Sequence, residues 1–363
     1  MNKNLLYKAG LTERFQQEAA MYEGLHLARV SAQSKDLYKV ITDSSEITAE
    51  IAGKLEFAAT SGADFPTVGD WVMIDRESDR SGNAIIHRIL TRQSVFERKA
   101  PGTSKQSQLV AANIDTVFIC MSLNTNFNLR RLERYLAIAW DSMAIPVVVL
   151  TKSDLCDDLP ARLAEVHSVA LGADVLVTSS MNENGHIAVK KYTGEGQTVA
   201  FLGSSGVGKS TLINRLIGDD VLAAKEIGAA DKGRHTTTRR QLIILPEGGA
   251  VIDTPGMREL QLESADLSTS FADIEELAAQ CRFSDCAHGQ EPGCAVKEAI
   301  AKGLLAAERL CSYQKLQTEL SYQGLNSRQL EQEKITKMFG SMGGMKQARA
   351  AIKEKHRRNS TAK

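Results

Sequence analysis

Short apolar runs separated by turns fill the first hundred residues of this 363-residue chain. Five of them, at residues 27–31, 37–42, 47–52, 70–75 and 84–90, have the length of β-strands and are joined by Gly- and Ser-containing turns. Five strands at this spacing predict a small β-barrel, and the oligonucleotide-binding (OB) type is the usual five-stranded case. Its ligand stays open, because few aromatic residues are available for stacking and some must be core: Tyr38, Phe57, Phe65 and Trp71.

A second group of apolar runs follows a polar stretch at residues 92–108, which contains Pro101-Gly102 and is interpreted as a linker. The runs at 116–119, 147–150, 175–177, 199–202 and 250–252 predict buried strands. Residues 210–217, stopped by Gly218, have the pattern of a helix.

The strongest chemical signal is Gly203-Ser204-Ser205-Gly206-Val207-Gly208-Lys209-Ser210, which matches GxxxxGK[ST] in full between a strand and a helix. Its glycines let successive backbone N–H groups face phosphate oxygens, and the positive end of the helix points at the same charge. We expect Lys209 on the β- and γ-phosphates and the Ser210 hydroxyl on Mg²⁺. The motif therefore indicates a nucleoside triphosphate rather than a glycine-rich turn that binds nothing.

Guanine is indicated by Thr151-Lys152-Ser153-Asp154, directly after the strand at 147–150. The Asp154 carboxylate can accept hydrogen bonds from N1 and N2 of guanine, a pairing that supports discrimination on the order of 10⁴-fold. Lys152 would lie along the ring. The usual motif has Asn where this chain has Thr151, so we expect a looser tether to the phosphate loop. The loop at residues 178–180 lies where a further contact with the base belongs.

A third motif, residues 253–256, ends the strand at 250–252. Asp253 would hold Mg²⁺ through water, and the Gly256 amide would contact the γ-phosphate. The next residue is Met257, whose thioether cannot orient an attacking water. Hydrolysis is then either intrinsically slow or assisted by another polar group.

His235 is the catalytic candidate, within residues 233–238, where the first switch of a GTPase belongs. An exposed loop histidine is the alternative, and Arg234 could equally stabilise charge in the transition state. One of the threonines at 236–238 should bind Mg²⁺ through its hydroxyl.

The order of these motifs is unusual, because the guanine motif precedes the phosphate loop and residues 253–256 come last. In an ordinary GTPase the phosphate loop comes first. The simplest explanation is a circularly permuted GTPase domain, in which the second switch is joined directly to the C-terminal region.

Length and charge leave room for two or three domains and indicate no global attraction to nucleic acid, since 44 Lys and Arg balance 44 Asp and Glu. Residues 346–363 hold seven Lys or Arg and one Glu. Such a tail suits either RNA phosphates or plain solvation. The opening residues lack the apolar run of a signal peptide, and no segment has the length of a membrane span, so we expect a cytoplasmic protein without a membrane partner.

A zinc site is predicted by four residues in one short, turn-rich window: Cys281, Cys286, His288 and Cys294. Three thiolates and an imidazole complete a tetrahedral structural site, with no position left for catalysis. Reduced thiols in a small core are the alternative. Cys120, Cys156 and Cys311 show no partner pattern and are interpreted as core residues.

Together these motifs resemble the ribosome small subunit-dependent GTPase A family. The matching segments are 151–154, 203–211, 233–238, 253–256 and the zinc ligands, which adds Thr211 to the nucleotide site. The resemblance implies a multidomain α/β protein: an N-terminal segment and five-stranded OB-type β-barrel at 1–104, a circularly permuted P-loop GTPase domain at 105–262, and a zinc-binding helical domain with a basic tail at 263–363.

The resemblance also implies late maturation of the small ribosomal subunit, with GTP hydrolysed to GDP and phosphate under stimulation by that subunit. It implies rRNA as a partner, His235 as the catalytic residue, one structural zinc per chain and Mg²⁺ with GTP; we expect a monomer. Two other functions stay open. One is a GTP-gated RNA-binding assembly chaperone with negligible turnover, and the other is a permuted GTPase acting on the large subunit.

Overall fold

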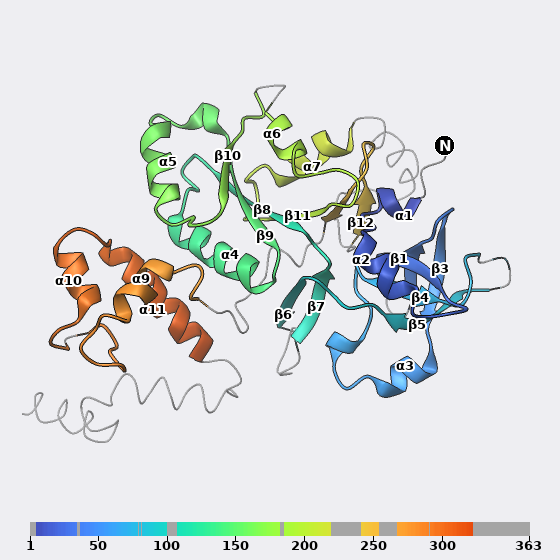
Figure 1. The fold of residues 1–363 in the computed structure, drawn as a ribbon. Coiled ribbons are helices and arrows are strands. Elements are labelled where there is room, and N and C mark those ends of the chain that lie inside the picture. Colours follow the sequence, from blue (N-terminus) through green and yellow to red (C-terminus); the bar gives the residue numbers. More distant parts are fainter. Residues whose placement is uncertain are drawn as a thin grey trace, which may run out of the picture. The chain divides into compact units, whose positions relative to one another are not determined.

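The computed structural model describes residues 5–34, 37–78, 80, 82–99, 107–181, 185–218, 241–253, 267–289 and 291–321 (Figure 1). The chain divides into two compact units, Met1–Leu316 and Gln317–Lys363. His235, the threonines at 236–238, Gly256 and the basic segment 346–363 lie outside the described residues. Among the described helices, none has an apolar stretch long enough to cross a membrane.

The N-terminal strands close into a barrel, as predicted. The strands are β1 (His26–Ser34), β2 (Leu37–Ile41), β3 (Glu46–Ile51), β4 (Trp71–Ile74) and β5 (Ala84–Ile89). They pair in the order β1-β2-β3-β5-β4, and β4 returns to β1. The β3–β5 pair is parallel, and the other pairs of the barrel are antiparallel. Alternate residues point inward, so Val30, Tyr38, Val72 and Ile86 fill the interior.

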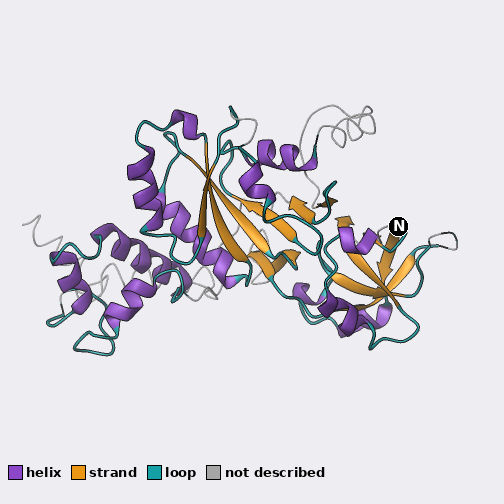
Figure 2. Cartoon of the chain, turned by 45° about the horizontal axis from the view of Figure 1, so that its top comes forward, coloured by secondary structure: helices purple, strands orange, loops and turns teal. Residues whose placement is uncertain are grey.

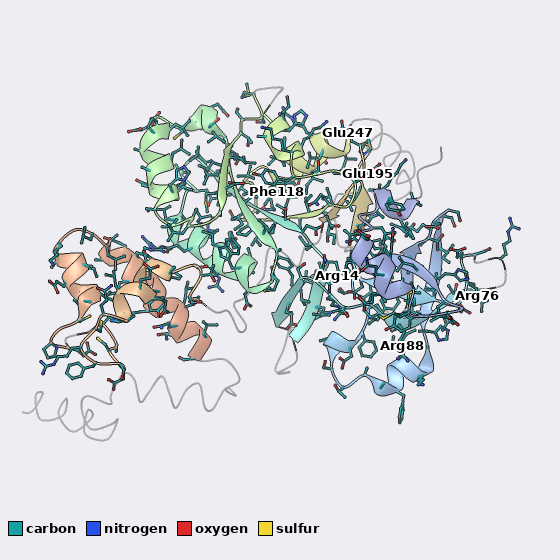
Figure 3. The ribbon with its side chains drawn as sticks, in the orientation of Figure 1. Arg14, Arg76, Arg88, Phe118, Glu195 and Glu247 are labelled. Carbon is teal, nitrogen blue, oxygen red and sulfur yellow. The ribbon has the colours of Figure 1, made fainter. Side chains whose placement is uncertain are left out.

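Short helices flank the barrel strands. They are α1 (Leu5–Lys8), α2 (Glu13–Ala19), α3 (Gly53–Ala58) and η1 (Gly62–Asp64). Of the aromatic residues available to bind a base, Tyr38 and Trp71 are buried in the core, whereas Phe57 on α3 is 94% exposed. Arg76 and Arg88 also lie on the barrel (Figure 3).

The second domain is built on a six-stranded part of the same sheet, in the order β10-β9-β8-β11-β13-β12. Its strands are β8 (Thr116–Ser122), β9 (Ile145–Thr151), β10 (Asp174–Val177), β11 (Thr198–Leu202), β12 (Gln241–Ile244) and β13 (Ala250–Asp253). All neighbours are parallel except β12, which is antiparallel to β13. The strands that flank β11 on one side therefore precede it in the chain, as the permuted order of motifs predicts.

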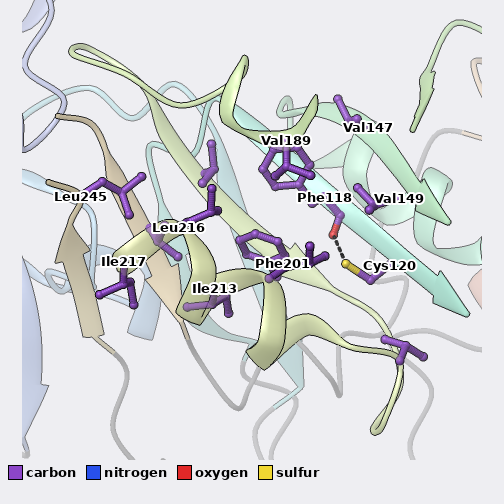
Figure 4. Packing of buried hydrophobic residues seen from close by; sticks show 14 residues of the cluster. Phe118, Cys120, Val147, Val149, Val189, Phe201, Ile213, Leu216, Ile217 and Leu245 are labelled. Carbon is purple, nitrogen blue, oxygen red and sulfur yellow. Dashed lines mark hydrogen bonds between the residues drawn. The ribbon is translucent and has the colours of Figure 1, made fainter. Parts of the chain in front are cut away.

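Helices cover both faces of this sheet (Figure 2). They are α4 (Leu129–Asp141), α5 (Leu159–His167), α6 (Ile187–Lys190) and α7 (Lys209–Ile217), with a short η2 (Ser153–Leu155). On one face, Phe118 and Phe201 pack with their rings tilted and the centroids 5.0 Å apart, in one buried cluster with Leu212 and Leu216 of α7 (Figure 4). All seven residues of β8 are buried, which explains its nearly continuous apolar sequence.

The interpretation of residues 92–108 as a linker is wrong for part of that segment. β6 (Val95–Lys99) pairs antiparallel with β7 (Ser107–Ala112). The side chains of Phe96 and Leu109 are 1% and 4% exposed, so this hairpin contributes to the core. Residues 109–112 of β7 are all buried, so both faces of this strand are covered.

Arg29 joins the barrel to the strand that carries the phosphate loop. Its side chain is fully buried and stacks on Trp71 with 4.9 Å from the guanidinium carbon to the ring centroid. It donates hydrogen bonds to the carbonyl groups of Gly69 (3.2 Å), Asn113 (3.0 Å) and Ala9, and to Thr198 Oγ1 (2.8 Å) at the start of β11. Burial lowers the pKa of Arg29 to about 10, partly opposed by the charges of Asp115 and Asp70. A pairing of Ala32 with Gln241 adds β1 to the edge of β12.

The C-terminal helices are α9 (Ala272–Ala278), α10 (Ala295–Ala301) and α11 (Ala307–Ser321). Phe271 and Tyr313 pack with ring centroids 5.3 Å apart. Arg309 binds Asp273 on α9 and also Glu133 on α4. Residues 267–316 are thereby attached to the parallel-sheet domain through a buried charge pair.

Candidate functional site

The phosphate loop lies between β11 and α7, at the carboxyl edge of the parallel sheet. Gly203 has φ +145°, and a Cβ there would stand 2.5 Å from the carbonyl oxygen of Cys120 on the neighbouring strand. Gly208 precedes α7 with φ +100°. Both positions therefore require glycine, and the backbone of the loop is free to turn its N–H groups inward.

Lys209 is nearly buried within this loop, with 7% of its surface exposed. Its Nζ donates to the carbonyl oxygens of Gly203 (2.7 Å) and Ser204 (2.6 Å). Phosphate oxygens can replace these neutral acceptors and give stronger, charge-assisted hydrogen bonds. Ser210 and Thr211 in the first turn of α7 are exposed.

A pocket of about 410 Å³ connects the phosphate loop with the predicted guanine motif. This volume is within the range typical of small-molecule sites, ~300–1,000 Å³. Its lining residues are Thr151, Lys152, Thr178, Ser179, Ser180, Ser205, Gly206, Gly208, Lys209, Ser210, Thr211, Leu212 and Arg215. The structure therefore brings together three loops that are separate in the sequence.

Thr151 ties the guanine motif to the phosphate loop. Its Oγ1 donates to the carbonyl oxygen of Val207 at 2.5 Å, and the residue is buried. The structure thus differs from the looser tether expected for threonine in place of asparagine. This bond needs one O–H donor, and the hydroxyl of Thr151, at the end of β9, is close enough to the Val207 carbonyl to supply it.

The loop at residues 178–180 packs beside the guanine motif, as its position in the sequence indicates. Ser179 Oγ donates to Asp154 Oδ1, and the backbone N–H of Ser153 donates to the carbonyl of Thr178 at 3.2 Å. Arg215 on α7 donates from Nη2 to the carbonyl of Ser180 at 2.6 Å. The carboxylate of Asp154 is exposed, so a base can reach it.

Asp253, the last residue of β13, lies at the same edge of the sheet as the phosphate loop. β13 is paired in parallel with β11, with Ile252 opposite Ala200. The side chain of Asp253 is half-buried. This position suits an aspartate that holds a metal ion beside the phosphates.

Two contacts to the phosphate loop were missed by the sequence interpretation. Asn126, between β8 and α4, and Arg131, in the first turn of α4, both bind the side chain of Ser204. The available signal was the alternation of Asn124, Asn126 and Asn128 directly after a buried strand. Such asparagines are typical of ordered turns and helix caps.

The four predicted zinc ligands come together, with their ligand atoms within 4.8 Å of one another. Cys281 Sγ lies 3.9 Å from Cys294 Sγ, and His288 Nδ1 lies 3.7 Å from Cys281 Sγ and 3.5 Å from Cys294 Sγ. For zinc bonds of ~2.3 Å to sulfur and ~2.05 Å to nitrogen, tetrahedral geometry requires ~3.75 Å between sulfurs and ~3.5 Å from sulfur to nitrogen. The residues therefore fit a zinc ion.

The turns around this cluster also suit a metal site. His288 has φ +56°, an uncommon conformation for a residue with a side chain. Glu291 accepts hydrogen bonds from the backbone N–H groups of Ala287 (3.2 Å) and Gly289 (2.6 Å). Cys294 precedes α10, and its Sγ accepts from the N–H of Lys297 at 3.4 Å. This bond stabilises negative charge on the sulfur.

The other cysteines differ from one another. Cys120 is buried, as predicted, and burial raises the pKa of its thiol to about 12. Cys156 is half-buried and Cys311 is exposed, so a core role is wrong for Cys311. Cys311 lies on α11 at a position that faces solvent.

Comparison with known proteins agrees with this geometry. Residues 89–263 match the sequence profile of the RsgA GTPase family. The chain is 54% identical over 355 residues to "Small ribosomal subunit biogenesis GTPase RsgA 2" of Lactiplantibacillus plantarum, covering 98% of this chain and 99% of that protein. It is 42% identical to "Small ribosomal subunit biogenesis GTPase RsgA" of Methanosarcina acetivorans, covering 91% of this chain and 90% of that protein.

Solved structures show the same fold. YjeQ from Thermotoga maritima superposes with a TM-score of 0.60 at 27% identity, covering 82% of this chain and 98% of that one. YloQ, described as a circularly permuted GTPase, also has a TM-score of 0.60, at 25% identity, covering 84% of this chain and 98% of that one.

Proposed function

Because the chain belongs to the RsgA GTPase family and is a GTP hydrolase, we propose that it binds the small ribosomal subunit and assists its late maturation. The observation that carries this proposal is the 54% identity, along nearly the whole chain, to a protein named for small ribosomal subunit biogenesis. Subunit-stimulated hydrolysis of GTP to GDP and phosphate would then drive release. The cytoplasm, where bacterial subunits are assembled, is the expected compartment, and a monomer is the expected state.

The pocket between the phosphate loop and the guanine motif is the proposed GTP site. Lys209 and the backbone of residues 203–208 would bind the phosphates, and Lys152 and Asp154 would bind the base. Ser210 and Asp253 would hold Mg²⁺, which neutralises phosphate charge when it is bound. The support is that Lys152, Lys209 and Ser210 line one pocket. Asp154 accepts a hydrogen bond from Ser179 of that lining, and Asp253 ends β13, the strand beside β11.

His235 is the proposed catalytic residue and Gly256 a proposed γ-phosphate contact, on the grounds given by the sequence. Since Met257 cannot orient water, the imidazole of His235, in the expected first switch, is the best available group in the sequence. Permutation places the second switch directly before the zinc-binding region, so a change in the conformation of the switch on loss of the γ-phosphate would be transmitted to that region.

We propose one structural zinc in the Cys281, Cys286, His288 and Cys294 cluster. The interatomic distances support it, and four protein ligands leave no position for a substrate.

We also propose the domain boundaries 1–104, 105–262 and 263–363. A zinc-stabilised region that follows the second switch would then form part of the subunit-binding surface.

The barrel is the proposed rRNA-binding domain, of OB type. The closed order β1-β2-β3-β5-β4, with β3 and β5 parallel and helix α3 between β3 and β4, supports this type. Phe57 on α3 offers an exposed ring on which a base can stack. The basic residues of 346–363 would add contacts with phosphates.

Cosedimentation with purified small subunits tests this proposal. The protein should bind in the presence of a non-hydrolysable GTP analogue and dissociate with GDP. Removal of residues 346–363 should weaken binding and reduce its salt dependence, because fewer counterions are released. Equal binding in both nucleotide states would contradict a GTP-controlled association, and a truncated protein with unchanged salt dependence would remove the tail from the interface.

A further inference from the structure

The segment between β8 and α4 contains three alternating asparagines, Asn124, Asn126 and Asn128, which order it beside the phosphate loop. Asn124 Oδ1 accepts from Ser122 Oγ (2.8 Å) and from the backbone N–H of Asn126 (3.1 Å). Asn128 caps α4, with its Oδ1 accepting from the N–H of Arg131 at 3.0 Å. The segment is thereby ordered at both ends, and Asn126, between them, contacts the phosphate loop.

Ser204, the second residue of the phosphate loop, is where this segment makes contact. Arg131 Nη1 donates to Ser204 Oγ (2.9 Å) and to Asn126 Oδ1 (2.9 Å), while Asn126 Nδ2 donates to Ser204 Oγ (3.2 Å). The three side chains form a closed triangle of hydrogen bonds, and all are half-buried. A hydroxyl oxygen accepts two hydrogen bonds, so these donors fill both acceptor positions of Ser204.

Fixing the position of Ser204 affects the orientation of the backbone N–H groups that the phosphate loop offers to phosphate. The carbonyl of Ser204 accepts a hydrogen bond from Lys209 Nζ, so the same residue is fixed through its side chain from α4 and through its backbone from the phosphate-binding lysine. A residue held from both sides has few alternative backbone conformations. The N–H groups that follow it then keep the orientation that an anion requires.

We propose that Arg131 is a positioning residue of the GTP site, which acts through the Ser204 hydroxyl to preorganise the phosphate loop. Asn126 supports the guanidinium in this role. The inference rests on the proposed GTP site and adds to it a charged residue from outside the nucleotide-binding motifs. Arg131 lies on α4, the helix whose Glu133 forms an ion pair with Arg309 of α11.

Nucleotide affinity of single and double variants of the full-length protein tests this assignment. Loss of a charge-assisted hydrogen bond in Arg131→Ala should weaken GDP binding about 10-fold. Ser204→Ala, which keeps every charge, should weaken it comparably, and the double variant should be little worse than either single one because both changes break one contact. Arg131→Lys keeps the charge and the N–H donors and should recover most of the affinity.

Arg14→Ala is the matched control, since Arg14 is an exposed helical arginine on α2 and does not line the pocket. Its GDP affinity should equal that of the unaltered protein. A Ser204→Ala protein with unaltered GDP affinity would overturn the proposal, as would full additivity in the double variant. Failure of the unaltered protein to bind guanine nucleotide would instead contradict the GTP site itself, so the two failures are distinguishable.

Discussion

Replacing Arg309 with Ala is expected to loosen the C-terminal helices from the GTPase domain. Arg309 Nη1 lies 3.0 Å from Glu133 Oε1, and these side chains are only 4% and 1% exposed. Arg309 also binds Asp273 through Nε (2.6 Å) and Nη2 (2.7 Å), and the carbonyl of Ser270 at 2.9 Å. Burial alone would lower the pKa of Arg309, but its bonds with Asp273 and Glu133 raise it above the ordinary value.

The expected cost follows from what the substitution leaves behind. Removing one partner of a buried ion pair costs ~3–5 kcal/mol. Glu133 keeps Arg130 as a partner at 2.6 Å, and Asp273 is 31% exposed and can hydrate, so we expect the lower limit, ~3 kcal/mol. In Glu133→Ala, Arg309 would still bind Asp273. The double variant should cost less than the sum of the single variants by ~1–3 kcal/mol.

Amide hydrogen exchange in α9 and in residues 307–316 measures this local opening free energy directly. Glu298→Ala is the control, because it removes a pair with Lys302 in which both side chains are more than half exposed. Such a pair contributes at most ~0.5 kcal/mol. If Arg309→Ala changes the opening free energy no more than this control does, the buried pair does not hold the C-terminal helices in place.

Three further outcomes are expected. Asp154→Asn should weaken GTP binding and favour xanthosine triphosphate, whose C2 oxygen accepts where guanine donates; comparing the two affinities checks this, and unchanged GTP affinity would remove Asp154 from the site. Purified protein should contain about one zinc per chain by metal analysis, which Cys286→Ser should lose and Cys311→Ser should keep; retention of the metal in Cys286→Ser would exclude the cluster. A thiol reagent at pH 8 should modify exposed Cys311 quickly and buried Cys120 only on unfolding; rapid labelling of Cys120 in folded protein would contradict its burial. Because folding raises the Cys120 pKa from 9.0 to about 12, the free energy of unfolding should decrease as the pH rises through that interval.

Much of the fold could be predicted because its strands carry local signals. The five barrel strands and the parallel strands around residues 116–252 lie within a few residues of their predicted positions. The β6–β7 hairpin was missed because polar residues and Pro101-Gly102 separate its buried parts. Phe96 on β6 lies thirteen positions before the first residue of the buried run 109–112 on β7.

Contacts between distant segments could not be predicted in the same way. Arg29 and Glu133 are charged residues within ordinary strand and helix patterns, and nothing local indicates that Thr198 or Arg309 will compensate their burial. The motifs of the GTP site were enough to predict which loops meet, since each motif follows a strand of one parallel sheet. Arg131 escaped notice because its contact with Ser204 depends on β8 lying beside β11, a pairing between segments about eighty residues apart.

In the proposed function, the small ribosomal subunit controls a permuted GTP site in this chain. Steady-state GTP turnover, measured with and without purified small subunits, tests it most directly. We expect slow release of phosphate by the protein alone, strong stimulation by small subunits, none by large subunits, and loss of most of the stimulated rate in His235→Ala with GTP binding retained. Turnover that stays negligible at saturating small subunits would contradict the claim and favour a GTP-gated assembly chaperone.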